Sequence, residues 1–150
     1  MEVVPFVGFG GIRFGMTADE VILALGPPDA IEDSYGDASH DYEESGLLLA
    51  YSSEDGGRLY SITVNSSTFV LNSVPIVGVS EDSLQTMGQG GILPGLALDE
   101  DFDFLDAKKY ECDVFGLSFW VRDGLVSNFT MLVQFDASGD RAIWPTPPES

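Results

Sequence analysis

Few residues of this chain combine the types and the spacing that enzymatic chemistry requires. His40 is the single histidine among 150 residues, so a Ser-His-Asp triad or a histidine general base would have to use it. It lies in the polar segment 37–41 without a companion motif, which favours an exposed loop residue over a catalytic one. Cys112 is the single cysteine, and the acidic neighbours Glu111 and Asp113 oppose formation of its nucleophilic thiolate. We therefore predict that the protein is not an enzyme; a glycosidase working through two carboxylates is the least favoured alternative.

The spacing of Asp99, Asp101 and Asp103 matches the start of a calcium-binding loop. Such a loop also needs a glycine at its sixth position and a glutamate at its twelfth. Phe104 and Tyr110 occupy those two positions, so the calcium-loop signature fails. We predict no metal site and no cofactor.

Charge is the most unusual property of the composition. The chain has 6 basic and 25 acidic residues, for a formal net charge of −19. Such a surface repels nucleic acid and anionic lipid and attracts basic proteins over long distances. Solubility alone is an equally good explanation of the charge, because many soluble proteins are acidic.

The acidic residues gather in two clusters that could line one rim of a sheet and meet a basic cleft in another protein. The first cluster comprises Asp33, Asp37, Asp41, Glu43 and Glu44. The second comprises Asp99, Glu100, Asp101, Asp103 and Asp106. Tyr35, Tyr42 and Trp120 are our candidates for aromatic anchors in the same interface. A solvated face is the alternative for any one of these acids, and core packing is the alternative for Trp120.

Two helices and two hairpins must position these residues. Thr17 and Glu20 form a capping box, and Gly26 before two prolines ends the helix, which predicts a helix over 17–25. Ser80 predicts a second helix over 81–87. The segments 47–51 and 58–65 read as one hairpin around Asp55-Gly56-Gly57, and 114–121 and 125–135 as another around Asp123-Gly124. We expect residues 26–41 to be mostly loop, with Ala30 and Ile31 as a candidate start of a short strand, and residues 98–106 to be an acidic extended stretch.

The order of these signals is the same in the two halves of the chain. We predict a single domain over 1–150, with one repeat at about 10–66, a second at about 67–136 and a mobile proline-rich tail at about 144–150. The predicted fold class is α+β, in which two tandem helix-plus-β-hairpin repeats form one antiparallel sheet with short helices on one face. A single cysteine and the lack of a basic, then apolar, leader favour the cytoplasm.

The opening of the chain reads Gly11-Ile12-Arg13-Phe14-Gly15-Met16-Thr17, followed by Glu20-Val21, Leu25-Gly26 and Pro28. It resembles small bacterial cytoplasmic proteins that act as immunity proteins against secreted or contact-delivered toxins. The second half adds Gly116-Leu117, Phe119-Trp120 and Asp123-Gly124, and the resemblance covers most of residues 8–135. The order of elements is also similar to the β-lactamase inhibitor protein fold and to small outer-membrane assembly lipoproteins.

This resemblance implies an antitoxin that binds and inhibits a cognate toxin. A basic toxin such as a nuclease would suit the charge of the chain, because its cleft must hold phosphates. The alternative is a non-catalytic scaffold that binds other proteins, with the fold of the assembly lipoproteins. The absence of a signal segment and of a lipidation cysteine from this chain favours the cytoplasmic antitoxin.

Overall fold

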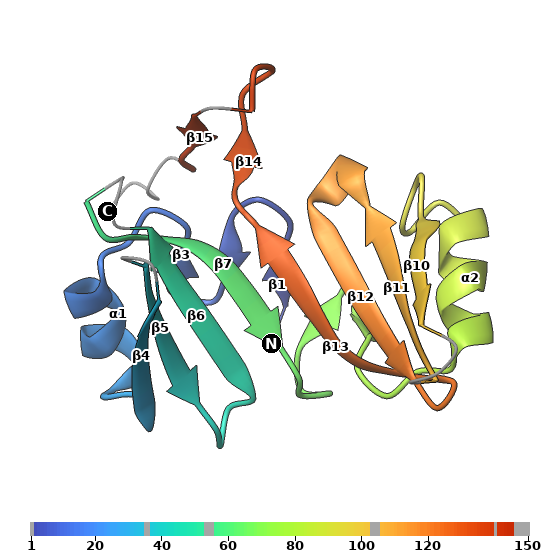
Figure 1. Cartoon of the computed structure of the whole chain (residues 1–150), viewed down its shortest axis with the longest axis horizontal. Helices are drawn as coiled ribbons and strands as arrows, with labels where there is room; N and C mark the ends of the chain where they lie inside the picture. Colours follow the sequence, from blue (N-terminus) through green and yellow to red (C-terminus); the bar gives the residue numbers. More distant parts are fainter. Residues whose placement is uncertain (1, 35–36, 53–55, 103–105, 140, 146–150) are drawn as a thin grey trace.

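One antiparallel sheet of eight strands runs through the whole molecule (Figure 1). The computed structural model describes residues 2–34, 37–52, 56–102, 106–139 and 141–145. From one edge of the sheet to the other, the strands are β10 (Ala97–Phe102), β11 (Ala107–Cys112), β12 (Leu117–Arg122), β13 (Leu125–Leu132), β7 (Arg58–Val64), β6 (Leu47–Ser52), β5 (Asp37–Tyr42) and β4 (Ala30–Ser34). The chain therefore builds the sheet from two groups of four strands that meet where β13 pairs with β7.

The first helix, α1 (Ala18–Leu25), begins and ends where the sequence predicts. The Thr17 hydroxyl accepts from the backbone N–H of Glu20, and the Glu20 carboxylate accepts from the backbone N–H of Thr17 at 3.1 Å. Gly26 ends the helix with a φ of 88°, a conformation that glycine adopts without strain. Val21 is the fully buried residue of this helix, and the partly buried Ala18 and Leu25 also pack against the core.

The second helix, α2 (Glu81–Gln89), extends the prediction by two residues. The Ser80 hydroxyl accepts from the backbone N–H of Ser83 at 3.1 Å, and Gly90 caps the other end. Leu84 and Met87 are its buried residues. Figure 1 places α1 beside β4 and α2 near β10, at opposite ends of the sheet.

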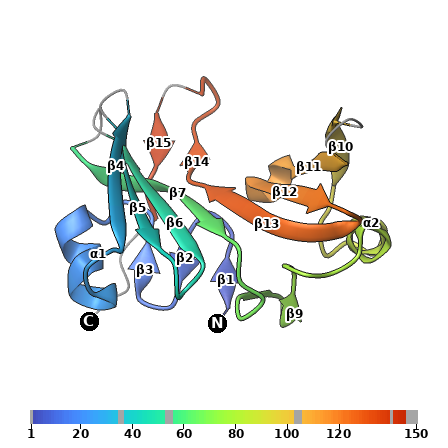
Figure 2. The same cartoon turned by 60° about the horizontal axis from the view of Figure 1, so that its bottom comes forward.

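Short strands and a 3-10 helix complete the fold. They are β1 (Val3–Val4), β2 (Gly8–Phe9), β3 (Ile12–Arg13), β8 (Val70–Leu71), β9 (Val74–Pro75), η2 (Asp113–Phe115), β14 (Gln134–Phe135) and β15 (Ala142–Ile143). Figure 2 shows β1, β2 and β3 beneath the middle of the sheet. Phe9, Ile12 and Phe14 from this segment are at most 3% exposed, so the N-terminal segment covers the part of the core that the helices leave open.

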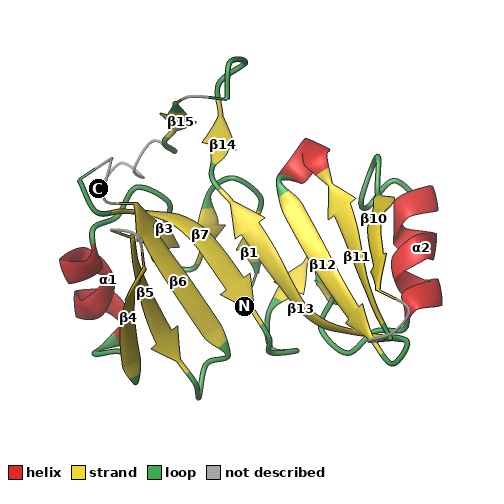
Figure 3. Cartoon of the chain, viewed as in Figure 1, coloured by secondary structure: helices red, strands yellow, loops and turns green. Residues whose placement is uncertain are grey.

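The prediction of two helix-plus-hairpin repeats is wrong. The structure is mostly β, with 49% strand and 15% helix, and Figure 3 shows how little of it is helical. Each predicted hairpin is one half of a longer meander, because β4 and β5 precede β6, and β10 and β11 precede β12. The segment expected to be loop over 26–41 holds β4 and all but the last residue of β5. These segments are strands because β5 pairs with β6 and β4 pairs with β5, rather than because of their own apolar pattern.

Candidate protein-binding face

The two faces of the sheet differ sharply, as one row of paired residues per face shows. The row Tyr42, Leu47, Val64, Phe129, Phe119 and Tyr110 crosses six strands and is buried throughout. The adjacent row points the other way and comprises Ala30, Asp41, Leu48, Thr63, Thr130, Ser118, Glu111 and Ala97. Every residue in this second row is half-buried or exposed. We call the side of the sheet that carries this row the open face.

The middle of the open face is made of small polar side chains. Thr63 and Thr130 lie opposite each other on β7 and β13, and their hydroxyl oxygens are 2.9 Å apart. Ser118 continues the row on β12, and Ser61 lies two residues before Thr63 on β7. Small side chains of this kind leave a broad, low surface. A protein that binds there restricts less side-chain entropy than it would on a surface of lysine or glutamate side chains.

The open face is large enough for a protein interface. Seven inter-strand spacings of about 4.8 Å make it about 34 Å wide, and strands of about six residues make it about 20 Å long. The resulting area of roughly 700 Å² is close to the ~800 Å² that each partner buries in a standard protein–protein interface.

An aromatic pair stands on the open face near the β10 edge. The rings of Phe102 and Trp120 are stacked, with centroids 5.7 Å apart and an interplanar angle of 21°. Lys109 lies opposite Trp120 in the register, and its ammonium is 3.3 Å from Glu111 and 3.7 Å from Asp99. Burial opposes the charge of Lys109, but the carboxylates, Glu111 first, outweigh it and raise its pKa. The positive charge of the Lys109 ammonium is therefore already balanced by carboxylates on this face.

The two acidic clusters lie at opposite edges of the sheet and do not meet. The first cluster follows β4 and β5: Asp33, Glu43 and Glu44 are exposed, and Asp41 is half-buried. The second follows β10, where Asp99, Glu100 and Asp101 are exposed, with Asp106 exposed in the next turn. Asp37 lies in β5, but its side chain, Tyr35 and Asp103 lie outside the described residues. The clusters therefore flank the open face instead of lining one rim.

The two aromatic candidates that the structure describes, Trp120 and Tyr42, have different positions. Trp120 is half-buried on the open face, as an anchor requires. Tyr42 faces the core, is 6% exposed and donates its hydroxyl to the carbonyl oxygen of Gly26 at 3.0 Å. It fixes the end of α1 against β5 and does not reach the open face. Phe102 was not among the aromatic candidates: its alternation with acidic residues marks one side of a strand, and only the register of β10, β11 and β12 brings it to Trp120.

His40 and Cys112 are both buried, on strands separated by four others. The prediction that His40 is an exposed loop residue is wrong: it lies in β5, is 5% exposed and has its ring 4.8 Å from that of Tyr51. Burial lowers the pKa of His40. Cys112 donates its S–H to the carbonyl oxygen of Pro94 at 3.2 Å, and burial raises its pKa, so this thiol is held in its unreactive form.

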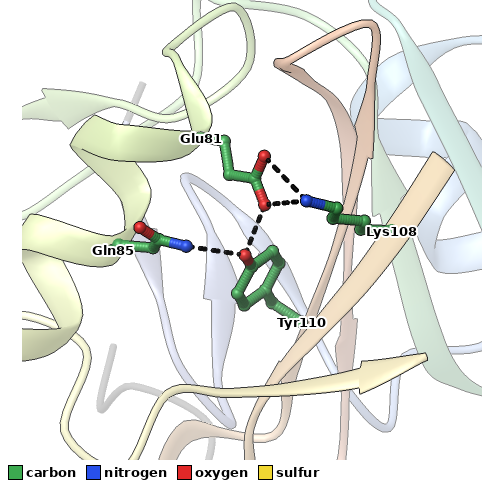
Figure 4. Close-up of polar contacts among 4 residues, drawn as sticks. All are labelled: Glu81, Gln85, Lys108 and Tyr110. Carbon is green, nitrogen blue, oxygen red and sulfur yellow. Dashed lines mark hydrogen bonds and ion pairs between the residues drawn. The ribbon is translucent and has the colours of Figure 1, made fainter. Parts of the chain in front are cut away.

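A polar network fastens α2 to β11 (Figure 4). The Tyr110 hydroxyl donates to Glu81 at 2.5 Å, and the Lys108 ammonium lies 3.2 Å from the same carboxylate. The Gln85 amide donates to the Tyr110 hydroxyl at 2.9 Å. The hydrogen bond from Tyr110, followed by Lys108, lowers the pKa of Glu81. These four side chains satisfy one another and hold the helix in place.

Within the described ranges, no three His, Cys, Asp or Glu side chains come together as metal ligands. In the same part of the chain, the helices are all too short or too polar to cross a bilayer.

Comparisons with known proteins give one structural likeness. No family model matches the sequence, and no curated protein matches it. The chain is similar to the 1.5 Å crystal structure of an extracellular protein containing an SCP domain from Bacillus anthracis, with 8% sequence identity and a TM-score of 0.49. The match covers 90% of this chain and 50% of that one, so this chain spans half the length of that protein. A likeness at this level carries no conclusion about activity.

Proposed function

We propose that the protein is a non-catalytic inhibitor, an immunity protein of the cytoplasm that binds a basic toxin such as a nuclease effector. The observation that carries this proposal is the open face, a sheet surface as large as a protein interface with carboxylates along both of its edges. With 25 acidic and 6 basic residues, the chain has too few basic side chains to balance its carboxylates.

The two acidic clusters lie at opposite edges of a broad face, so a convex basic partner could sit between them. A narrow groove would not suit such a partner as well. A partner seated on the small side chains around Thr63 and Ser118 would meet negative charge on both flanks. Such complementarity accelerates association and fixes orientation more than it adds affinity. We therefore expect fast association that slows steeply as salt rises.

The Phe102–Trp120 pair would supply the apolar contact of the interface. Stacked aromatic side chains bury a large area at low entropic cost, and interface hot spots are enriched in tryptophan. The exposed side chain of Leu48, on the other half of the open face, offers a second apolar contact. Trp120→Ala should weaken binding by about 2 kcal/mol, the usual minimum for a hot spot.

Co-expression with a toxic domain encoded beside this gene tests the proposal. The expected result is that the protein restores growth to cells that produce the basic C-terminal domain of the neighbouring reading frame. Growth arrest that persists while both proteins are soluble and abundant would contradict it.

Charge reversal then tests the role of the flanks. The combined substitution Glu32→Lys, Glu43→Lys, Glu100→Lys should slow association about tenfold or more at low salt; exposed Glu32 shares the open face with Ala30. Asp82→Lys, on the exposed side of α2, makes the matched control because it changes charge away from the open face. Equal effects of the two sets per charge reversed would show that net charge alone matters.

A further inference from the structure

Two arginines converge on one hollow although the chain is strongly acidic. A pocket of about 280 Å³ is lined by Arg13, Arg58, Glu20 and Trp144, with Phe14 and Met16 in its walls. Lys108 and Lys109 are ion-paired with carboxylates. Neither Arg13 nor Arg58 has such a partner among the residues that the structure describes. In a chain with four times as many acids as bases, two unpaired guanidinium groups at one pocket need an explanation.

The backbone fixes the two arginines on neighbouring segments. The Gly15 N–H donates to the Leu59 carbonyl at 2.9 Å, and the Leu59 N–H donates to the Met16 carbonyl at 2.8 Å. This ladder continues through an antiparallel bridge between Thr17 and Arg58. The segment that carries Arg13 therefore runs beside the start of β7, so the pocket is part of the folded framework.

Trp144 forms an apolar wall of the pocket. Its ring lies against Gly15, where an added Cβ would be 3.3 Å from the indole. The guanidinium carbon of Arg58 lies 5.4 Å from the centre of the same ring. Trp144 begins the segment predicted to be a mobile tail, and residues 146–150 of that segment lie outside the described residues. The indole holds Arg58 at the pocket through a cation–π contact.

Glu20 is the acidic group of the pocket, but the capping box already uses it. One of its carboxylate oxygens accepts from the Thr17 backbone N–H at 3.1 Å and lies 3.2 Å from the Thr17 hydroxyl. Two positive groups against one negative group leave the pocket with an excess positive charge, beside apolar walls.

We propose that this pocket binds a small organic oxyanion, a carboxylate or phosphate carried on a small apolar body. The guanidinium groups of Arg13 and Arg58 donate hydrogen bonds to the oxyanion, since arginine matches planar carboxylate and phosphate oxygens in pairs. The apolar body lies against Trp144 and Met16. The site holds whether or not the open face binds a protein.

Tryptophan fluorescence measures this binding directly. Trp120 and Trp144 are the two tryptophans of the chain, so Trp120→Phe leaves Trp144 as the reporter. We expect saturable fluorescence changes with benzoate, phenyl phosphate or both, and the stronger ligand identifies the preferred oxyanion. Sodium chloride at matched ionic strength and the neutral analogue benzyl alcohol should give none. A response to neither anion, or equal responses to the controls, would overturn the proposal.

Three substitutions in the Trp120→Phe protein locate the site. Arg13→Gln and Arg58→Gln should each weaken anion binding by about tenfold or more, the usual effect of losing a charge-assisted hydrogen bond. Arg122→Gln, an exposed arginine on β12, should leave affinity unchanged. Glu20→Gln keeps a side-chain acceptor for the cap but removes the opposing charge, so it should tighten binding about two- to threefold. Unchanged affinity in all of them would place the binding elsewhere and refute the assignment.

Discussion

Two buried tyrosines of the same core should respond in opposite directions to loss of their hydroxyl groups. Tyr51 is 2% exposed, and its hydroxyl oxygen has no hydrogen-bond partner in the described part of the chain. Burial raises the pKa of this hydroxyl, as expected for a group far from water. Tyr42, by contrast, donates to the Gly26 carbonyl at 3.0 Å. Tyr51→Phe and Tyr42→Phe therefore form a matched pair.

The expected magnitudes follow from the cost of leaving a buried polar group unpaired, which is about 1–3 kcal/mol. Tyr51→Phe removes such a group without opening a cavity, so the free energy of unfolding should rise by about 1 kcal/mol. Tyr42→Phe removes a formed hydrogen bond and should lower the free energy of unfolding by about 1 kcal/mol. In a chain of this size, the two melting temperatures should differ by about 4–8 °C.

Urea unfolding followed by circular dichroism measures both variants. An unchanged dependence on denaturant would show that only stability has changed. The reasoning is refuted if Tyr51→Phe destabilises the protein as much as Tyr42→Phe does, because the Tyr51 hydroxyl would then have a partner such as a buried water.

Three further predictions concern other parts of the fold. Gly116→Ala should destabilise the protein by about 2–3 kcal/mol, because the φ of Gly116 is 64° and an added Cβ would lie 2.6 Å from the ring of Phe6. Gly124→Ala should cost about 1 kcal/mol, because the φ of Gly124 is 78° but the space around it is open. Equal melting temperatures of the two variants would contradict this prediction. The lowered pKa of His40 means that the unfolded chain binds its proton more readily, so stability should fall as pH drops below about 6.5; His40→Phe should flatten this loss in urea titrations, and an unchanged pH profile would exclude the histidine as its cause. Glu81→Gln should destabilise the protein by about 1 kcal/mol by weakening the attachment of α2. Amide hydrogen exchange should then become faster in α2, and an increase confined to other regions would disprove that role.

Local signals predicted the parts of the fold that local chemistry decides. Thr17 and Glu20 satisfy backbone groups only a few residues away, so the capping box is readable from the sequence and the structure contains it. The same holds for Asp123 and Gly124, whose φ values of 53° and 78° form the predicted two-residue turn.

The edge strand β4 was not predictable in this way. Residues 30–34 include Glu32 and Asp33 and have little strand propensity of their own. They form β4 because His40 and Tyr42 on β5 face the core and carry their neighbours into the sheet. Strand identity here depends on pairing across the sheet, which no local pattern encodes.

The candidate site was predictable in composition more than in arrangement. The two acidic clusters can be read from the sequence, but the strand order that places them at opposite edges depends on the pairing of β13 with β7. Trp120 could be named from its residue type. Its stacking on Phe102 depends on the register of β10 on β11, which brings Phe102 within reach of β12.

Binding to the open face is the central claim, and one affinity comparison tests it most directly. Ser118→Arg places a long side chain in the middle of the open face, whereas Ala24→Arg places the same side chain on the exposed side of α1. Titration calorimetry with the basic domain that the protein neutralises should show binding at least a hundredfold weaker for Ser118→Arg and unchanged for Ala24→Arg, with both variants folded. Equal affinities of the two variants would show that the partner binds elsewhere and would contradict the account.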